Sequence, residues 1–472
     1  MDDGAGKTYR AFEPERYAQQ AYSPAQKLPE GDLVYFLLDL VPQLDLSRFR
    51  RYYEDETRGA PPFDPTQMVC LLVYAYSVGV FSSRKIALAC ERNLAFLAIV
   101  GDQRPDFRTI SDFRKIHLDA FVTVFADVLR LAGAAGMVRL GNLATDGTKI
   151  VGNASRHKAM SYGYMKKEEQ RLRAEIEGLL AQAQGQDDSD DAVLGSRRGD
   201  ELPEELRRRE ERLATIQVAK QRLEAQARAA AEAERQRRQE AEAERQRHGQ
   251  KRRGKEPGPV VEEPADKAQS NFTDPEMKIM KMNNKGWDYC GNAQVTVDGS
   301  FQIIVACDVT AAANDKQQAV PLAAAARAQL DQAGIDLPKD AGGHVPKIPA
   351  TLDSGYFSEK AVAGLEALGF DPYIATGRQR HHTPAEAEPA PLSAEATAQE
   401  RMAAKVRTPL GRALYAARKV IVEPVFGQIK GARGFRRFLL RGLAKVRGEW
   451  RLVCLTHNLL KLWRYRNAPA VA

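Results

Sequence analysis

The sequence is poor in the residues that hold zinc or build disulfide frameworks. Its 472 residues include five cysteines and seven histidines. No CxxC spacing occurs, and the cysteines lie far apart in apolar surroundings: Cys70, Cys90, Cys290, Cys307 and Cys454. Neither a zinc site nor a disulfide framework is expected, and we interpret the cysteines as reduced core residues.

Long hydrophobic runs and several enzyme motifs are also missing. The longest apolar stretch, from Met68 to Phe81, has 14 residues; it is too short to span a bilayer and predicts a buried helix. The first residues, MDDGAGKTYRAF, lack the hydrophobic segment of a secretory signal, so the cytoplasm is the expected location. Nothing matches GxxxxGK[ST], HExxH, GxSxG, or GxGxxG after a strand, which leaves carboxylates as the candidate catalytic groups.

Positive charge is concentrated near the C-terminal end. The net charge is +8, but residues 401–472 contain 17 Lys and Arg against two acids, Glu423 and Glu449. Such an excess predicts a polyanionic partner, because each neutralised phosphate releases counterions. A solubilising basic tail is the alternative. Apolar side chains such as Phe435, Phe438 and Trp450 alternate with the charges and favour a packed element.

Residues 1–135 are expected to be helical. Pro61, Pro62 and Pro65 precede a helix near 66–80, and further short helices follow. Basic residues on their exposed faces would suit a helix-turn-helix-like DNA reader: Arg84, Lys85, Arg108 and Arg114. An ordinary helical bundle with a solvated basic face fits the same residues.

The middle of the chain predicts an α/β core. Residues 141–151 indicate a strand, and 292–297 and 302–307 flank Asp298-Gly299, a strong hairpin signal. A helix over about 316–332, a strand over 348–353, a helix over about 358–368 and a short strand, DPYIAT, follow. Strands and helices alternating around one core indicate an α/β arrangement.

Two segments interrupt that core. Residues 164–250 are rich in Glu, Arg, Ala and Gln, and they divide at 184–203 into two long helices. Leucine and isoleucine recur at helical spacing on both, which predicts a helical hairpin or coiled coil whose apolar seam ends near Leu223. The second interruption, 377–404, is rich in Pro, Ala and Glu and predicts a disordered loop, with His381 and His382 as solvated loop residues.

Three carboxylates stand at the ends of predicted elements. Asp146 lies in a strand before Gly147, and Asp353 ends a strand before Ser354-Gly355. Glu423 is expected to begin an amphipathic helix, with Pro424 in its first turn. Two-metal phosphoryl transfer needs an aspartate on a rigid strand and further carboxylates around the ions. Asp146 and Asp353, each taken alone, are more typical of turns.

Three blocks resemble the catalytic blocks of bacterial insertion-sequence DDE transposases: TDGTKIVGNAS (145–155), TLDSGYFS (351–358) and VEPVFGQIKGARGFRRFLLRG (422–442). The group in question carries a Tyr-Arg-Glu-Lys signature around its third acid. Tyr415, Arg418, Glu423 and Lys430 match it, with one residue more between Arg and Glu than is typical. The resemblance extends to the N-terminal helical region, to HKAMSYGYM and to the ending RGEWRLVCLTHNLLKLW, and so covers nearly the whole chain.

The resemblance implies a transposase with an RNase H-like mixed sheet and flanking helices. Asp146, Asp353 and Glu423 would bind two catalytic Mg²⁺ or Mn²⁺ ions. The enzyme would cleave at the inverted-repeat ends of an element and join the 3′-OH ends to target DNA. The residues implied to contact DNA phosphates are Tyr415, Arg418, Lys430, Arg433, Arg436 and Arg437. For Tyr415 and Arg418, packing and surface charge before a helix remain an alternative.

These inferences define a domain plan. It comprises an all-α DNA-binding domain (1–135), a catalytic domain in three parts (136–163, 271–376 and 405–472), a helical insertion (164–270) and the loop 377–404. The expected partners are double-stranded DNA, as terminal inverted repeats and target, and a second copy of the chain, because joining two ends requires two active sites. The insertion is interpreted as a dimerisation or DNA-bridging arm, or as a structural insertion that leans on the core.

Two other functions fit the same residues. A nuclease on the same fold would cut without joining, and it would need the same three acids. A non-catalytic DNA-binding or scaffolding protein built around the helical insertion would not need them.

Overall fold

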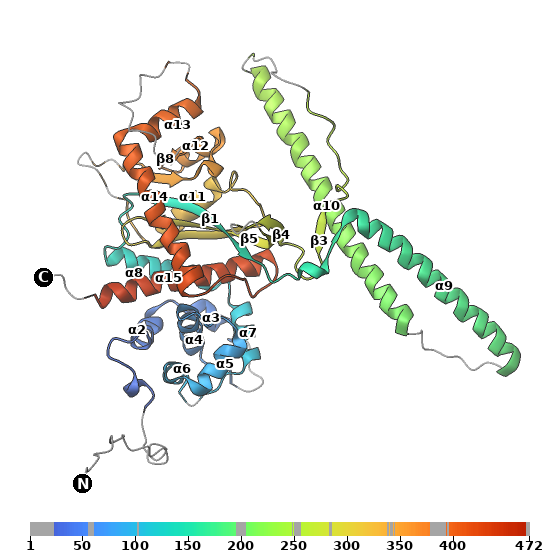
Figure 1. The fold of residues 1–472 in the computed structure, drawn as a ribbon. Helices are drawn as coiled ribbons and strands as arrows, with labels where there is room; N and C mark the ends of the chain where they lie inside the picture. The colour runs from blue at the N-terminus through green and yellow to red at the C-terminus, as the bar shows by residue number, and fades with distance from the viewer. Residues whose placement is uncertain are drawn as a thin grey trace, which may run out of the picture.

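The structure is a computed structural model, which shows a helical N-terminal region, a central α/β core and a projecting two-helix arm (Figure 1). It describes residues 23–54, 61–101, 103–194, 204–247, 256–282, 286–337, 345–377 and 396–468, together with positions 249, 339, 343 and 393. Within these residues no helix is long and apolar enough to cross a membrane. The interpretation of His381 and His382 falls outside them.

The described part of the N-terminal region is helical, as predicted. Its elements are η1 (Ala25–Lys27), α2 (Leu33–Leu40), η2 (Val41–Gln43), α3 (Ser47–Arg51), α4 (Pro65–Ser77), α5 (Ser83–Arg92), α6 (Leu94–Val100), α7 (Phe107–Ile116) and α8 (Phe121–Ala134). Asp64 and Asp106 cap α4 and α7 by accepting bonds from backbone N–H groups of the first turn. The apolar run over α4 is a buried helix, since every residue from Met68 to Ser77 is buried.

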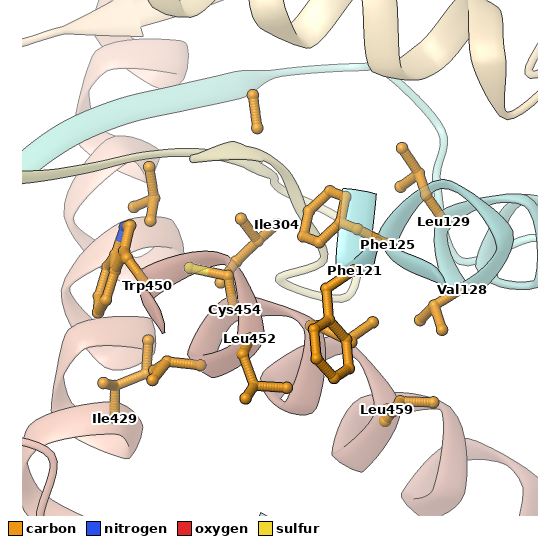
Figure 2. Packing of buried hydrophobic residues seen from close by; sticks show 14 of the residues in the cluster. Phe121, Phe125, Val128, Leu129, Ile304, Ile429, Trp450, Leu452, Cys454 and Leu459 are labelled. Carbon is orange, nitrogen blue, oxygen red and sulfur yellow. The ribbon is translucent and has the colours of Figure 1, made fainter. Parts of the chain in front are cut away.

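The N-terminal helices share one hydrophobic core with the rest of the chain. The last helix, α15 (Leu443–Arg466), packs against α4 and α8 on one side and against the sheet on the other. Figure 2 shows Phe121 and Phe125 of α8 beside Leu452 and Leu459 of α15. The helices before the predicted boundary at residue 135 and the elements after it therefore form two layers around one hydrophobic core.

A buried polar bridge reinforces this junction. Tyr76 of α4 donates to the Glu449 carboxylate of α15 at 3.1 Å, and the Arg114 guanidinium donates to the Tyr76 hydroxyl at 2.9 Å. Glu449 also accepts the backbone N–H groups of Leu439 and Leu440. Burial raises the pKa of Glu449, and Arg114 opposes that shift.

Six strands form a mixed sheet. They are β1 (Leu143–Val151), β4 (Lys278–Lys281), β5 (Trp287–Asp298), β6 (Ile304–Thr310), β7 (Ile348–Leu352) and β8 (Phe370–Ile374). The path runs β4-β5-β1-β7-β8, with β6 also paired to β5. The pairs that involve β5 are antiparallel, whereas β1-β7 and β7-β8 are parallel. The predicted hairpin at Asp298-Gly299 and the predicted strands are confirmed.

Helices cover this sheet. α11 (Ala319–Gln332) and α12 (Glu359–Ala367) follow β6 and β7, close to the predicted ranges, and η4 (Ser354–Tyr356) lies between β7 and α12. α13 (Ala398–Arg407) leads into α14 (Pro409–Gly427), which contacts β1 and β7 and continues as the π-helical turn η5 (Gln428–Ala432). A two-stranded sheet of β2 (Ala159–Ser161) and β3 (Gln269–Asn271) marks the base of the arm.

Two predictions about this region are wrong. Residues 398–404, assigned to the disordered loop, are helical, because Thr397 and Glu400 form a reciprocal capping box at the start of α13; 378–392 and 394–395 lie outside the described residues. Glu423 does not begin a helix, because α14 starts 14 residues earlier and holds Pro424 in its interior.

The proline is tolerated inside α14 because another side chain satisfies the backbone. Pro424 has no N–H to donate to the carbonyl of Val420 four residues before it. The side-chain amide of Gln302, in the β5–β6 turn, donates to that carbonyl at 3.0 Å. Gln302 is itself held by Lys461, which donates to its Oε1 at 2.7 Å, and by His457, whose ring contacts its carbonyl.

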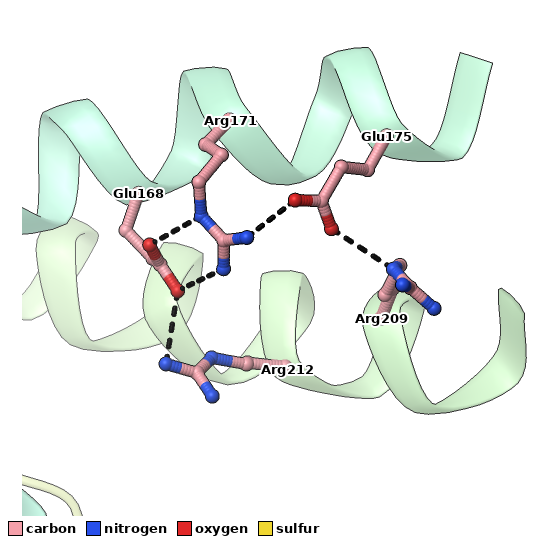
Figure 3. Close-up of polar contacts among 5 residues, drawn as sticks. All are labelled: Glu168, Arg171, Glu175, Arg209 and Arg212. Carbon is pink, nitrogen blue, oxygen red and sulfur yellow. Dashed lines mark hydrogen bonds and ion pairs between the residues drawn. The ribbon is translucent and has the colours of Figure 1, made fainter. Parts of the chain in front are cut away.

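The arm is an antiparallel pair of helices, as the sequence predicts. α9 (Tyr162–Leu194) and α10 (Glu204–Arg247) enclose a small hydrophobic core of their own, which includes Leu172, Ile216 and Leu223. Ion pairs flank it: Glu168 binds Arg171 and Arg212, and Glu175 binds Arg209 (Figure 3). The apolar seam ends near Leu223, and α10 continues to Arg247 beside residues 256–262, to which it is joined by contacts such as Arg235–Glu262.

Candidate active site

Two of the predicted acids emerge from neighbouring parallel strands. β1 and β7 are in register up to Thr145 and Leu352, and Asp146 and Asp353 are the next residues on each strand. The Asp353 carboxylate accepts the N–H of Ser354 at 2.7 Å and caps η4. Because parallel strands carry both side chains to the same place, the sheet topology brings together two acids that are 207 positions apart in the sequence.

Asp146 is held by a cation and by its own backbone. Its Oδ2 accepts from Nη1 of Arg418 at 2.9 Å, and its Oδ1 accepts the N–H of Gly147 at 2.8 Å. Burial raises the pKa of Asp146, Arg418 and the Gly147 N–H lower it, and the negative charge of Asp353 raises it further. The site therefore places two carboxylates close enough to repel each other, with the Arg418 guanidinium near both.

Arg418 reaches this position from α14. Its side chain is only 7% exposed, and its guanidinium lies over the Tyr415 ring, 5.7 Å from the ring centroid. Its Nε is buried with no hydrogen-bond partner in the described structure. Burial raises the pKa of Tyr415. Arg418 is thus a half-satisfied buried cation whose Nη1 is bound to Asp146.

The third predicted acid is not brought to the other two. Glu423 follows Arg418 by five residues, about 140° around an α-helix, and its side chain is exposed. Among the residues that the structure describes, no group of three or more His, Cys, Asp or Glu side chains is close enough to hold a metal ion. Asp146 and Asp353 offer the oxygen donors that Mg²⁺ prefers, and the role of Glu423 stays a prediction.

Lys430 lies against β1. Its Nζ donates to Oγ1 of Thr148 at 2.7 Å and to the carbonyl of Lys149 at 3.1 Å. Burial lowers its pKa, and the nearby charge of Arg436 lowers it further. The ammonium is therefore two residues along β1 from Asp146, on the side of the strand that Arg418 also contacts.

The arginines after Lys430 divide into two kinds. Arg436 and Arg437 are exposed. Arg433 is buried, and its guanidinium donates to the carbonyl of Val453 and to Thr456 on α15. These donors are committed to the protein interior, and the expectation that Arg433 contacts DNA stays a prediction.

The N-terminal basic residues divide in the same way. Arg84, Lys85 and Arg108 are exposed on α5 and α7, and the guanidinium groups of Arg84 and Arg108 both lie over the Phe107 ring. Arg114 was expected on an exposed face, but it is 4% exposed. That expectation is wrong, because Arg114 is part of the buried bridge to Tyr76 and Glu449 and also donates to the carbonyl of Phe81.

A polar network that the sequence did not predict lies next to these acids. Asp315, in the connection between β6 and α11, accepts from the side-chain amides of Asn292 and Gln294, each at 2.7 Å. The hydroxyl of Tyr356 in η4 donates to the Oε1 of Gln294. In the sequence Asp315 follows Asn314, and an Asn-Asp dipeptide between a strand and a helix is typical of a turn. The sequence therefore offered no specific signal for this cluster.

Two family models match separate parts of the chain, one near its start and one near its end. A family model described as "Transposase domain (DUF772)" matches residues 23–116, and one described as "Transposase DDE domain" matches residues 379–463. No curated protein and no solved structure gives a significant match. The first match covers η1 to α7, and the second covers α13, α14 and most of α15, with Tyr415, Arg418, Glu423 and Lys430. Together the two matches support an insertion-sequence DDE transposase.

Proposed function

We propose that this transposase cleaves DNA at the inverted-repeat ends of an insertion sequence and joins the 3′-OH ends to target DNA. The observation that carries the proposal is the pair Asp146 and Asp353 on adjacent parallel strands, with Arg418 and Lys430 beside it. A basic C-terminal region of 17 Lys and Arg supplies the charge that a DNA partner requires.

The sheet supports an RNase H-like fold within this proposal. Three antiparallel strands, β6, β5 and β1, are followed by the parallel strands β7 and β8. Asp146 and Asp353 are carried by β1 and β7, the parallel pair at the centre of the sheet, and α14 contacts both strands. This arrangement presents acids from rigid elements to a substrate on one side of the sheet.

The residues present fit a divalent-metal site in part. Transposases of this kind generally use divalent metals. Asp146 and Asp353 provide hard oxygen donors whose negative charges repel each other, and an added cation would relieve this repulsion. In the proposal they hold Mg²⁺ or Mn²⁺, two ions per site, with Glu423 as the third ligand. Such ions activate water or a 3′-OH and stabilise the leaving oxygen.

The chain's own residues have separate tasks. In the proposal, Arg418 exchanges the Asp146 carboxylate for a DNA phosphate. Two observations support this role: only its Nη1 is bound to Asp146, and its Nε has no hydrogen-bond partner. Lys430, anchored on Thr148, presents a positive charge beside β1. Exposed Arg436 and Arg437, together with Arg84, Lys85 and Arg108, are proposed to bind the DNA backbone away from the reacting phosphate.

An assay with a pre-cleaved element end separates the proposed function from its rivals. Terminal repeats taken from the DNA that flanks the gene would be mixed with a target plasmid, the full-length protein and Mn²⁺. Joined products are expected from the wild type and from Asp331→Asn, a matched control on the exposed surface of α11, but not from Asp146→Asn. Cleavage without joining would identify a nuclease, and joining by Asp146→Asn would refute the assignment of the acid.

Joining two ends requires two active sites, so the proposal includes a homodimer on paired DNA ends. The arm supports this role because it has its own core and projects from the base formed by β2 and β3. Deleting residues 164–266 should abolish paired-end assembly while binding to a single end persists. Intact paired-end complexes in a gel shift would show instead that the arm is a structural insertion.

A further inference from the structure

A buried polar network lies under the two aspartates. Asn292 and Gln294 stand two residues apart on β5, so their side chains share one face of the sheet. Both are at most 1% exposed, and both donate an amide N–H to the same Oδ1 of Asp315. Because Asn292 also donates to the carbonyl of Ala312 at 3.1 Å, its amide orientation is fixed by two acceptors.

This orientation leaves one polar atom without a partner. The Oδ1 of Asn292 is buried and accepts no hydrogen bond in the described structure. It points toward Gly147, where an added Cβ would lie 3.0 Å away. Turning the amide over would direct this oxygen at the Asp315 carboxylate and the Ala312 carbonyl, which are both acceptors. Asp315 therefore keeps the amide in an orientation that leaves the buried Oδ1 of Asn292 without a hydrogen bond.

The residue beside Asp146 gives the network room. Gly147 is the partner of Gln294 in the β1–β5 register. A Cβ at Gly147 would lie 2.2 Å from the Nε2 of Gln294, so only a residue without a side chain allows Gln294 to lie across β1. The amide of Gln294 therefore passes directly beside the backbone that carries Asp146.

The same amide reaches the loop that carries Asp353. Tyr356 is fully buried, and its hydroxyl donates to the Oε1 of Gln294. Tyr356 ends the single turn η4, which the Asp353 carboxylate caps. A chain of hydrogen bonds thus runs from Asp315 through Gln294 and Tyr356 to the backbone turn after Asp353.

We propose that Asp315 is a positioning residue, which sets the separation of Asp146 and Asp353 through Gln294 and Tyr356 and thereby tunes the affinity of the site for divalent cations. The inference rests on the proposed function, because it assumes that these two aspartates hold the metal. Asp315 acts here as a double hydrogen-bond acceptor. Its effect should therefore survive when an uncharged acceptor of the same shape replaces it.

The test measures Mn²⁺ binding to the full-length protein without DNA, by calorimetry, with the fold checked by circular dichroism. Asp315→Ala should weaken binding about 10-fold, the lower end of the range for loss of a residue bonded to a metal ligand, because Asp315 acts through Gln294 and Tyr356. Asp315→Asn, which keeps an acceptor oxygen, should stay within about threefold of the wild type. Tyr356→Phe, which removes only the hydroxyl, should weaken binding to an intermediate degree, and Asp331→Asn should have no effect.

The outcomes distinguish the inference from the function on which it rests. If Asp146→Asn binds Mn²⁺ like the wild type, the proposed metal site itself is wrong. If Asp146→Asn loses binding but Asp315→Ala does not, the positioning role is refuted. Equal losses for Asp315→Asn and Asp315→Ala would also refute it, since the charge of Asp315 would then act directly on the metal. Should Asp315→Ala fail to fold, Tyr356→Phe decides: unchanged binding overturns the inference.

Discussion

Gly147→Ala provides the sharpest test of how the site is built. The backbone of Gly147 is ordinary strand, so alanine meets no conformational strain there. The added methyl group would lie 2.2 Å from the Nε2 and 2.9 Å from the Cδ of Gln294. Both atoms belong to a fully buried side chain held at each end by a hydrogen bond, so Gln294 has to leave its position.

The cost follows from the two bonds that Gln294 would lose. The bond to the Asp315 carboxylate contributes about 1.5–3 kcal/mol, as is usual for a charged acceptor, and the bond from Tyr356 about 1 kcal/mol. Alanine returns about 0.5–1 kcal/mol relative to glycine in a strand. The net destabilisation should be about 1.5–3.5 kcal/mol, or about 3–14 °C in melting temperature for a core of about 150–250 residues.

The assay is urea unfolding of the full-length protein followed by tryptophan fluorescence, because Trp450 is fully buried and donates to the carbonyl of Gln294. Gly141→Ala is the matched control, since a Cβ there meets nothing within 4 Å. It should leave the stability unchanged or raise it slightly. A Gly147→Ala protein as stable as this control would show that Gln294 does not occupy the space beside Asp146.

Three further predictions concern other parts of the structure. Gln302→Ala should cost about 1–2 kcal/mol, because the Val420 carbonyl left free by the proline in α14 loses its donor. Gln302→Gly should destabilise the protein less than Gln302→Ala, since φ is +60° at this position and glycine adopts it without strain. If Gln302→Ala were as stable in urea as the wild type, the role of Gln302 would be contradicted. The arm should weaken in acid: Arg173 and Lys220 lower the pKa of Glu169 to about 2, so its stabilising contribution is present above about pH 4.5 and is lost as the pH falls toward 2. Helicity at 222 nm should therefore fall less over this range in Glu169→Gln, and identical acid profiles would exclude the effect. Arg418→Gln should weaken binding to element ends in a gel shift. Without DNA, the same substitution should shift Mn²⁺ binding by Asp146 to higher pH, because the cation that lowers the pKa of Asp146 is gone. An unchanged pH dependence would show that the ion pair does not affect Mn²⁺ binding.

The local sequence determined most of the secondary structure and two of the acids' positions. Alternation of β-branched residues, the Asp298-Gly299 turn and the apolar spacing of the arm depend on neighbours a few residues away, which is why those elements could be predicted. Asp146 and Asp353 could be found because the first lies within a predicted strand and the second stands at the end of one, and resemblance to a family added Glu423. Periodicity could not show that α14 continues through Pro424, since the donor that makes this possible, Gln302, lies 122 positions earlier.

Tertiary structure alone decided which charges are available. Arg84 and Arg114 look alike in the sequence, yet one is exposed and the other is buried against Glu449, a residue 335 positions away from Arg114. Arg433 is committed to α15, Arg418 to Asp146, and Asp315 to two amides on β5. Burial makes an unpaired charge expensive, so each buried charge takes the partner that the packed elements bring to it. Such pairing depends on how the sheet and helices assemble, and no spacing along the chain encodes it.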